Sequence, residues 1–546
     1  MTEVPVCVIG CGPIGLTGAL LLSRHGVPVL LVERRSELNT HPRSRFVDTN
    51  TMELFREFGV EKGVEDTGLG PAWTAYNRWS DTLAAEPYAT IPSPTFLSVP
   101  GPNSPCIPVM TAQDEVEAAL MTRVADDPMI TVRFDTEAID LGQTDDSAHL
   151  TLRDTKTDER EAVTAQYVIG ADGPGSGTRE VIGTRLEAEP RPVYSQDVIF
   201  HADLDAYVGD RKGSLLYTTT SQGVVIFQPL DGRRRWRCQV VVGDENLVSE
   251  EAASARIRVA LGTDDDVELE ILSMRMWQPT PGCVTQFAKG RIFLAGDAAH
   301  VSVPTGGMGN NTGFAGIRNL AWKLAYVLRG LAPPSILDTY EEEHRPIAVE
   351  RIAHGVSTTD YMSAMMLGHI GGLDVDEHIE ATHQYADYDD LLLGFEMSSS
   401  LIAPNAEPPA DRQDPANRRR PPGGSVSAEF VPLLRSGRRA PHVWVDADGT
   451  ESVLDWYGYS YVLLVGSACS LEAWQAAIAD LPAGAAPVSV RQLPAHACGG
   501  PYQAGAVVLV RPDGVIAWCR NDFDGRPELS GVSAYLPHPA RGAVAG

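Results

Sequence analysis

The sequence predicts an α/β fold of several domains, and three observations indicate it. A strand, a glycine-rich turn, a helix and a second strand follow one another over residues 4–33. A further apolar strand ends at Ala295 and leads into a second glycine-rich segment, 304–309. From about residue 428 short strands, at 442–446, 461–465, 506–511 and 514–519, alternate with one helix near 470–480. Apolar strands joined by helices are typical of buried parallel sheets in doubly wound proteins.

The elements follow in order along the chain. Residues 4–10 form an apolar strand, 13–26 read as a helix ended by Gly26, and 27–33 form the next strand, which together make a βαβ unit. Gln113 to Val124 is an amphipathic helix. Strand-like alternation then dominates 129–169, a sheet-rich stretch covers 185–275, and a long helical region covers 313–366.

Composition narrows the class of protein. A chain of 546 residues is too long for one core, so two or three domains are expected. The net charge of −28 disfavours nucleic acid and anionic membranes as partners. No apolar run is long enough to span a bilayer, and the start of the chain does not resemble a signal peptide. The eight cysteines include no CxxC pair, which favours reduced thiols in a cytoplasmic protein and predicts no metal site.

The first glycine turn is a nucleotide-binding pattern. Gly10 permits the tight turn, Gly12 lets backbone N–H groups approach a pyrophosphate, and Gly15 allows close packing of helix and strand. Glu33, at the end of the next strand, is expected to bind a ribose hydroxyl. A glycine turn without a ligand is the alternative. The predicted contacts also include Pro13, Ile14 and Arg34.

The second glycine-rich segment predicts the other end of the same cofactor. Asp297 follows an apolar strand and can accept hydrogen bonds from ribityl hydroxyls. Gly306, Gly307 and Gly309 then let a helix N-terminus approach a flavin ring, where its dipole stabilises negative charge at N1 and O2. A plain helix cap is the alternative. Two such turns on one dinucleotide favour FAD over NAD, and Asn310 and Asn311 are added to the predicted contacts.

These motifs resemble the single-component FAD aromatic hydroxylases, the family of para-hydroxybenzoate hydroxylase, phenol hydroxylase and polyketide-tailoring oxygenases. The GxGxxG turn, the internal Asp172-Gly173 and Gly296-Asp297 carry the resemblance over roughly residues 4–400. It implies an FAD enzyme in which NADPH or NADH visits transiently and O2 reacts to give a flavin C4a-hydroperoxide. It also implies that Asp172 and Gly173 contact FAD near the nicotinamide path. Further implied contacts are Arg43 at the pyrophosphate, Gln113 at the ribityl chain, Arg179 closing the Asp-Gly segment, and Pro304 beside C4a.

The same resemblance divides the chain. It implies a Rossmann-type FAD-binding domain with an inserted β-sheet substrate domain and a C-terminal thioredoxin-like α/β domain. That last domain lacks CxxC, so a structural or homodimer-contacting role is expected. The predicted bounds are 1–183 and 277–401 for the FAD-binding parts, 184–276 for the sheet-rich domain, 402–427 for a linker, and 428–546 for the last domain.

The family places its aromatic substrate between the inserted sheet and the flavin. Each expected substrate contact is also a plausible core residue: Tyr217, Phe227, Gln228, Trp236, Arg237, Gln239 and Trp277. His300 reads as a buried capping residue rather than a base, and the Met-rich stretch 361–366 as core or an adaptable pocket. Two departures lie near the flavin, Gly316 where the family commonly has Asp, and Met308 where it has Gln or Leu.

The predicted function is hydroxylation of a phenolic or quinone aromatic, with a polycyclic polyketide favoured by fold-level analogy. Baeyer–Villiger or ring-cleaving oxygenation is the alternative, and no residue decides between the two. A non-catalytic flavin-fold binding protein is the second alternative. Halogenation is disfavoured because the chain has no Trp-x-Trp-x-Ile-Pro segment.

Overall fold

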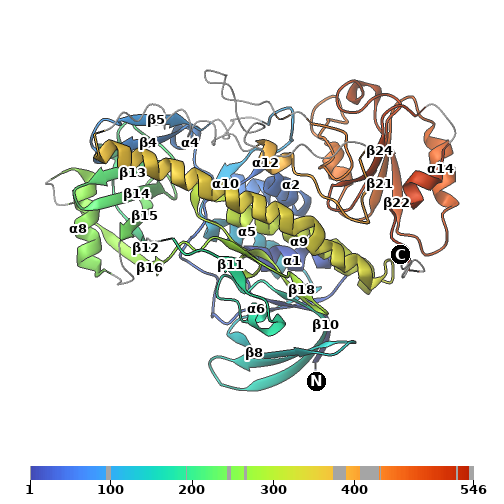
Figure 1. Cartoon of the computed structure of the whole chain (residues 1–546), viewed down its shortest axis with the longest axis horizontal. Helices are drawn as coiled ribbons and strands as arrows, with labels where there is room; N and C mark the ends of the chain where they lie inside the picture. The colour runs from blue at the N-terminus through green and yellow to red at the C-terminus, as the bar shows by residue number, and fades with distance from the viewer. Residues whose placement is uncertain are drawn as a thin grey trace.

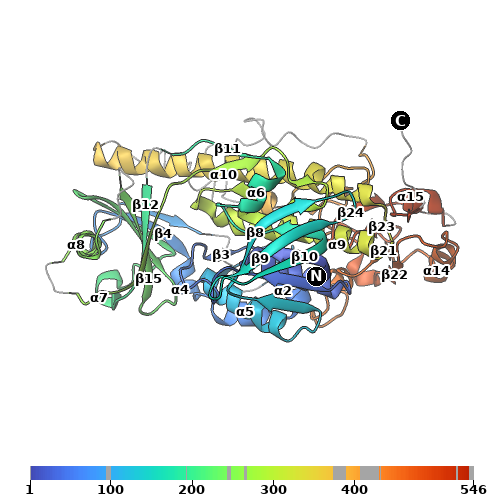
Figure 2. The ribbon, with the colours of Figure 1, turned by 90° about the horizontal axis from the view of Figure 1, so that it is seen from below.

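A computed structural model of the chain describes most of its residues and shows three regions along one axis (Figures 1 and 2). A nucleotide-domain sheet lies at the centre, a second sheet at one end and the C-terminal domain at the other. No helix in the described part is long and apolar enough to cross a membrane. The described residues are 2–93, 100–191, 194–242, 248–263, 267–372, 389–405, 430, 432–523 and 527–539.

The central sheet confirms the predicted α/β fold. Its parallel core runs β19-β10-β1-β2-β7, comprising Ile292–Leu294, Arg160–Gly170, Thr2–Ile9, Val29–Val32 and Ile130–Arg133. β9 (Ala148–Asp154) pairs antiparallel with β10 and with β8 (Thr136–Gln143), and β18 (Ala288–Lys289) pairs with β19 at the edge of the sheet away from β7. Helix α1 (Pro13–Arg24) packs against α5 (Gln113–Ala125) and α9 (Met308–Leu328). The carboxyl ends of β1, β10 and β19 therefore lie side by side, where ligands bind in such sheets.

The second sheet is larger than the sequence indicates. Its order is β16-β12-β15-β14-β13-β4-β5, and helix α8 (Glu250–Leu261) covers one face. Five strands come from the predicted insert: β12 Tyr194–His201, β13 Leu215–Thr220, β14 Gly223–Pro229, β15 Arg235–Val242 and β16 Glu270–Trp277. The other two, β4 (Tyr76–Ser80) and β5 (Ala89–Pro92), come from the stretch assigned to the nucleotide domain, and β4 pairs in parallel with β13. This hairpin, predicted as part of the FAD-binding domain, thus lies in the second sheet.

The predicted helical region 313–366 is two helices. α9 ends at Leu328, where Gly330 has a φ of +68° and Pro333 precedes the short helix η3 (Pro334–Asp338). α10 (Thr339–Ile370) then runs from the central domain to the second sheet (Figure 1). Its far end thus lies beside the face of the second sheet that looks toward the nucleotide domain.

The C-terminal domain has a four-stranded sheet, β22-β21-β23-β24, covered by α14 (Leu471–Ala479). β21 (Tyr461–Val465), β23 (Val507–Val510) and β24 (Ile516–Arg520) fall where the sequence predicts strands. The expected strand 442–446 is only an isolated bridge between Trp444 and Ser452, and β22 (Val488–Gln492) was not predicted. Most of the predicted linker, 406–427, lies outside the described residues.

Candidate active site

One cavity of about 1810 Å³ joins the nucleotide domain to the second sheet. It is lined by the β1–α1 turn, the Asp172-Gly173 segment, the Gly296-Asp297 segment and the start of α9. The same cavity continues along β13, β14 and β15 to Met362 and Met366 of α10. A long dinucleotide and a second, aromatic ligand can therefore share one cavity.

The first glycine turn has the geometry that close approach requires. Gly10 has a φ of +107°, and a Cβ there would lie 2.4 Å from the carbonyl oxygen of Ala171. A Cβ on Gly15 would lie 1.9 Å from the Gly10 oxygen, so Gly15 lets α1 pack on β1 without lining the cavity. At Gly12 the space is open and no side chain caps the helix. The first N–H groups of α1 are thus available to an anion, and Pro13 and Ile14 line the cavity beside them.

Glu33 and Arg34 lie at the end of β2, on the cavity wall. The Glu33 carboxylate is almost fully buried and accepts hydrogen bonds from the backbone N–H groups of Cys11 and Arg35, both at 3.0 Å. These bonds fix its position, and each oxygen retains a lone pair for a further donor. The arrangement fits a ribose hydroxyl.

Asp297 lies on the cavity wall, and its neighbour Gly296 packs against the start of α1. Gly296 has a φ of +59°, and a Cβ there would meet Ile14 at 2.9 Å. Burial raises the pKa of the Asp297 carboxyl, and Arg43 and Arg179 oppose this shift. In the described part of the chain its carboxylate has no hydrogen-bond or ion-pair partner, although it lines the cavity. A polyhydroxylated ligand chain would supply the missing donors.

The start of α9 presents a second helix N-terminus. Gly306 and Gly307 have φ values of +82° and +62°, and a Cβ on Gly307 would lie 2.7 Å from Cβ of Phe46. No side chain caps α9, and Pro304, Gly309 and Asn310 line the cavity next to it. Together with the turn at Gly12, this end fits FAD, since one helix start faces each end of the cofactor.

Asn311 does not reach the cavity, contrary to the prediction. Its side chain accepts a hydrogen bond from the N–H of Asp48 at 3.0 Å and donates to the Phe46 oxygen at 3.0 Å. It also donates to the Gly307 oxygen at 2.8 Å. Asn311 therefore does not face the cavity but holds the turn at Gly307 against Phe46 and Asp48.

Two residues implied by the family resemblance, Asp172 and Gln113, line the cavity, and a third, Arg179, links two of its segments. Asp172 lines the cavity but accepts hydrogen bonds from the N–H and hydroxyl of Thr178 at 3.0 and 2.9 Å, while Gly173 beside it has a φ of +82°. Arg179 donates to the oxygens of Pro174 and Ala298, so it ties the Asp-Gly segment to the Gly-Asp segment. Gln113 accepts from the Ser44 N–H at 3.2 Å and so holds the segment that carries Arg43 on the cavity wall.

The second sheet turns one face to the cavity. Five of the residues expected to contact the substrate line it: Tyr217, Gln228, Arg237, Gln239 and Trp277. Phe227 and Trp236 do not, and these two predictions are wrong. Both are buried on the opposite face, in the core beneath α8, because neighbours along a strand point to opposite sides.

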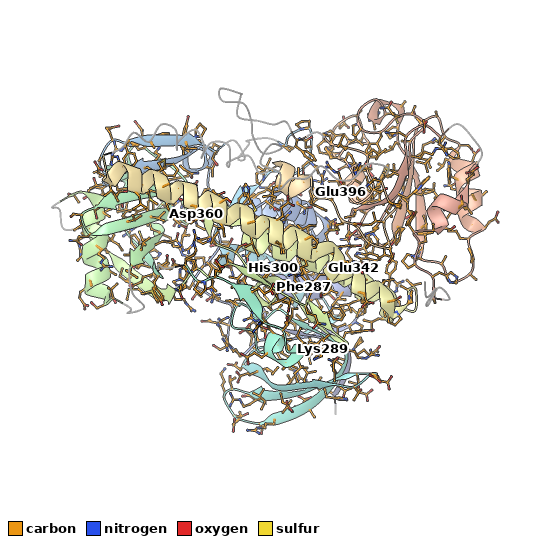
Figure 3. All side chains as sticks on the ribbon, in the orientation of Figure 1. Phe287, Lys289, His300, Glu342, Asp360 and Glu396 are labelled. Carbon is orange, nitrogen blue, oxygen red and sulfur yellow. The ribbon has the colours of Figure 1, made fainter. Side chains whose placement is uncertain are left out.

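His300 is buried as expected but caps nothing. Figure 3 shows it beside Phe287, and their ring centroids are 6.2 Å apart. Neither of its ring nitrogens has a hydrogen-bond partner in the described structure, and burial lowers its pKa to about 4. His300 does not line the cavity.

Some lining residues were not predicted. Asp197 pairs with Arg237 at 2.6 Å, and Arg45 reaches across from the segment before β3 (Phe46–Val47). Met362 and Met366 line the cavity, whereas Met365 is buried in the core. The Met-rich stretch therefore contributes both to the pocket and to the core. Asp197 could have been predicted from the alternation of side chains along β12, which puts it on the cavity face. No local sequence pattern indicates that Arg45 reaches the cavity.

The fold and this cavity are those of FAD-dependent monooxygenases. A family of FAD-binding domains matches residues 3–354, and the C-terminal domain of aromatic-ring hydroxylases matches 434–536. The chain therefore belongs to the family of FAD-dependent aromatic-ring hydroxylases, and it is a flavoprotein monooxygenase that uses NAD(P)H and O2.

Similar proteins share nearly the whole length. Tetracenomycin B2 monooxygenase-dioxygenase of Streptomyces olivaceus is 30% identical over 572 residues, which cover 98% of this chain and 98% of that protein. Aklavinone 12-hydroxylase RdmE of Streptomyces purpurascens is 31% identical, covering 97% and 98%.

Solved structures agree with this membership. The flavin-dependent monooxygenase PieE in complex with FAD and substrate matches with a TM-score of 0.84 at 27% identity, covering 95% of this chain and 96% of that one. Aklavinone-11 hydroxylase with FAD and aklavinone matches with a TM-score of 0.80 at 28% identity, covering 96% and 97%.

Proposed function

We propose that this enzyme hydroxylates a polycyclic, polyketide-derived phenol or quinone. The observation that carries the proposal is the continuity of the cavity between two uncapped helix starts and a wide, partly apolar sheet face. Relatives named for tetracenomycin B2 and aklavinone support a multi-ring substrate. The homodimer stays a prediction from the family resemblance.

The proposed cofactor contacts have separate roles. The start of α1 at Gly12 and the guanidinium of Arg43 hold the pyrophosphate, while Glu33 binds the ribose. Asp297 accepts from the ribityl hydroxyls. The start of α9, at Gly306 and Gly307, directs its positive end at the ring, where it stabilises negative charge.

FAD, when bound, accepts a hydride from NAD(P)H and activates O2, so that one oxygen atom can be transferred to the ring. The protein around it orients the acceptor and excludes water. Ile226, Met362 and Met366 provide an apolar surface, and Gln228, Arg237 and Gln239 a polar one. Pro304 lies at the turn that the family places beside the reacting carbon.

The test is NADPH oxidation in air by the FAD-loaded protein, with and without polycyclic hydroxyquinones, with product mass and NMR spectra recorded together. We expect stimulated oxidation and a product heavier by one oxygen that carries a new phenolic hydroxyl. Asp146→Asn, an exposed change outside the cavity, should behave as wild type. A product with an inserted ester oxygen or an opened ring would contradict hydroxylation and favour the Baeyer–Villiger alternative.

A further inference from the structure

Four polar side chains form a hydrogen-bonded chain on the cavity face of the second sheet. Arg45 donates from Nε to Oε1 of Gln228 at 2.9 Å, and Arg237 donates to the same oxygen at 3.4 Å. Nε2 of Gln228 then donates to Oε1 of Gln239 at 2.9 Å. All four side chains are almost fully buried and line the cavity.

The two arginines fix the direction of every bond in this chain. A guanidinium can only donate, so the Gln228 atom that meets both must be the carbonyl oxygen. Its NH2 group must then face Gln239, and the Gln239 atom that accepts must be its oxygen. The NH2 group of Gln239 is therefore the free end of the chain.

The two arginines are themselves held firmly. Arg45 also donates to the backbone oxygens of Pro229 and Ser214, both at 2.8 Å. Arg237 donates to the Arg43 oxygen at 2.9 Å and to Asp197 at 2.6 Å. Asp197 is the one carboxylate that is hydrogen-bonded to this chain in the described structure, so two guanidinium charges face one negative charge. The local field accordingly favours an electron-rich ligand atom.

Gln239 presents this NH2 group where a ligand would lie. The side chain lines the cavity, and in the described part of the chain its nitrogen has no hydrogen-bond partner. Tyr217 and Ile226, which flank it toward α10, form an apolar surface for rings. The sheet face thus offers one fixed donor beside an apolar wall.

We propose that Gln239 determines specificity by donating a hydrogen bond to an acceptor oxygen of the substrate, either a carbonyl, a quinone oxygen or a phenolate. The donor is imposed by Arg45 and Arg237 through Gln228. This rests on the proposed function for the identity of the ligand, and it sets which edge of the ring system faces β14 and β15.

The experiment changes the group that Gln239 presents to the cavity from a donor to an acceptor, by a substitution at Gln228. In Gln228→Glu both carboxylate oxygens accept, so the amide of Gln239 must turn its NH2 toward residue 228 and present its oxygen to the cavity. Two probes of one ring skeleton are titrated into FAD-loaded protein without NAD(P)H. Fluorenone has a ketone oxygen that can only accept, and 9-fluorenol has a hydroxyl that can also donate. Binding is read from the flavin absorption spectrum.

We expect the Kd of fluorenol divided by that of fluorenone to fall about tenfold in Gln228→Glu. The oxygen of Gln239 then accepts from fluorenol and repels the ketone, and tenfold corresponds to about one hydrogen bond. Gln239→Leu should weaken fluorenone binding about tenfold. Gln222→Glu, which adds the same charge in the exposed turn between β13 and β14, should leave the ratio unchanged.

An unchanged ratio in Gln228→Glu that still binds FAD would overturn the proposal. If that variant fails to bind FAD, Gln239→Glu puts an acceptor directly at the same place and must shift the ratio in the same direction. An unaltered fluorenone affinity in Gln239→Leu would overturn it as well. Because no turnover is measured, failure to hydroxylate would contradict the proposed function and leave these ratios as they are.

Discussion

At the scale of single residues, the departure at Gly316 has a physical counterpart on the neighbouring helix. A Cβ at Gly316 would lie 2.5 Å from Nε2 of His344, which fills the space that a side chain on α9 would use. Burial and the neighbouring His300 hold the pKa of His344 well below its usual range, so it is neutral. The imidazole of His344 thus occupies the space that an Asp side chain at position 316 would need. No local pattern in the sequence links the two positions.

Replacing this glycine should therefore destabilise the fold. We expect Gly316→Ala to lower the free energy of unfolding by about 1–3 kcal/mol through overpacking against His344. Chemical denaturation of the FAD-free protein measures it. Gly63→Ala, also in a helix but with its nearest neighbour 3.9 Å away, should be neutral or stabilising by up to about 1 kcal/mol. Equal effects at both sites would contradict the packing argument.

Asp297 gives a prediction about cofactor affinity. Asp297→Asn keeps the size of the side chain but removes the charge that strengthens hydrogen bonds from the ribityl hydroxyls. We expect FAD to bind about 10- to 100-fold more weakly, the loss typical of one or two such bonds. Fluorescence titration of the apoprotein with FAD measures this. Unchanged affinity would show that Asp297 does not contact the cofactor.

At the scale of elements, a buried ionic network fastens the C-terminal domain to α9 and α10. Glu343 accepts from Arg511 at 2.6 and 2.8 Å and from Lys323 at 2.8 Å, and all three are fully buried. Arg511 and Lys323 hold the pKa of Glu343 well below its usual range even though its burial opposes this. Asp513 adds a second carboxylate to Arg511 and accepts from Trp322 at 3.2 Å.

Removing one cation from this network should lower the free energy of unfolding strongly, because it leaves a buried carboxylate without its partner. Arg511→Met leaves Glu343 and Asp513 buried without their main partner, so we expect a loss of about 3–5 kcal/mol in unfolding free energy. Arg520→Met on β24, whose partner Asp522 is exposed, should change stability by less than about 0.5 kcal/mol. Thermal unfolding of both variants decides, and similar shifts would mean that the network contributes little.

Elements with a strong local period were predicted well, and those made by distant pairing were not. The β1–α1–β2 unit carries its own glycines and apolar runs, so its bounds agreed to within a few residues. β4 and β5 join the second sheet only by pairing with β13, which lies far along the chain. Within the site, the alternation of β14 and β15 should have assigned Phe227 and Trp236 to the opposite face from Gln228 and Arg237.

At the scale of the whole molecule, buried neutral imidazoles make stability depend on pH. Burial lowers the pKa of four of them to about 4, and that of the fifth well below its usual range: His25, His41, His300, His442 and His344. Since the unfolded chain binds these protons near pH 6.5, it holds more protons than the folded chain between these values. Stability should be complete above about pH 6.5 and fall as the pH drops toward 4.

Denaturant titrations at pH 7 and pH 5 measure this loss, with a slope of up to about 1.4 kcal/mol per pH unit for each imidazole. His442→Gln should make the pH dependence shallower, whereas the exposed His496→Gln should not alter it. A stability that is flat between pH 7 and 5 would contradict the neutral state of these imidazoles.

The parallel pairing of β4 with β13 also has a consequence for biosynthesis. The β4–β5 hairpin is synthesised before residues 93–214, and at about 5–20 residues per second its partner strand follows on the order of ten seconds later. During that interval the hairpin presents an open strand edge, the kind of surface that chaperones cover and that aggregates if it is left alone. Codon changes that slow translation between the two segments should therefore reduce the yield of this enzyme in the cell while leaving each finished molecule as active as before.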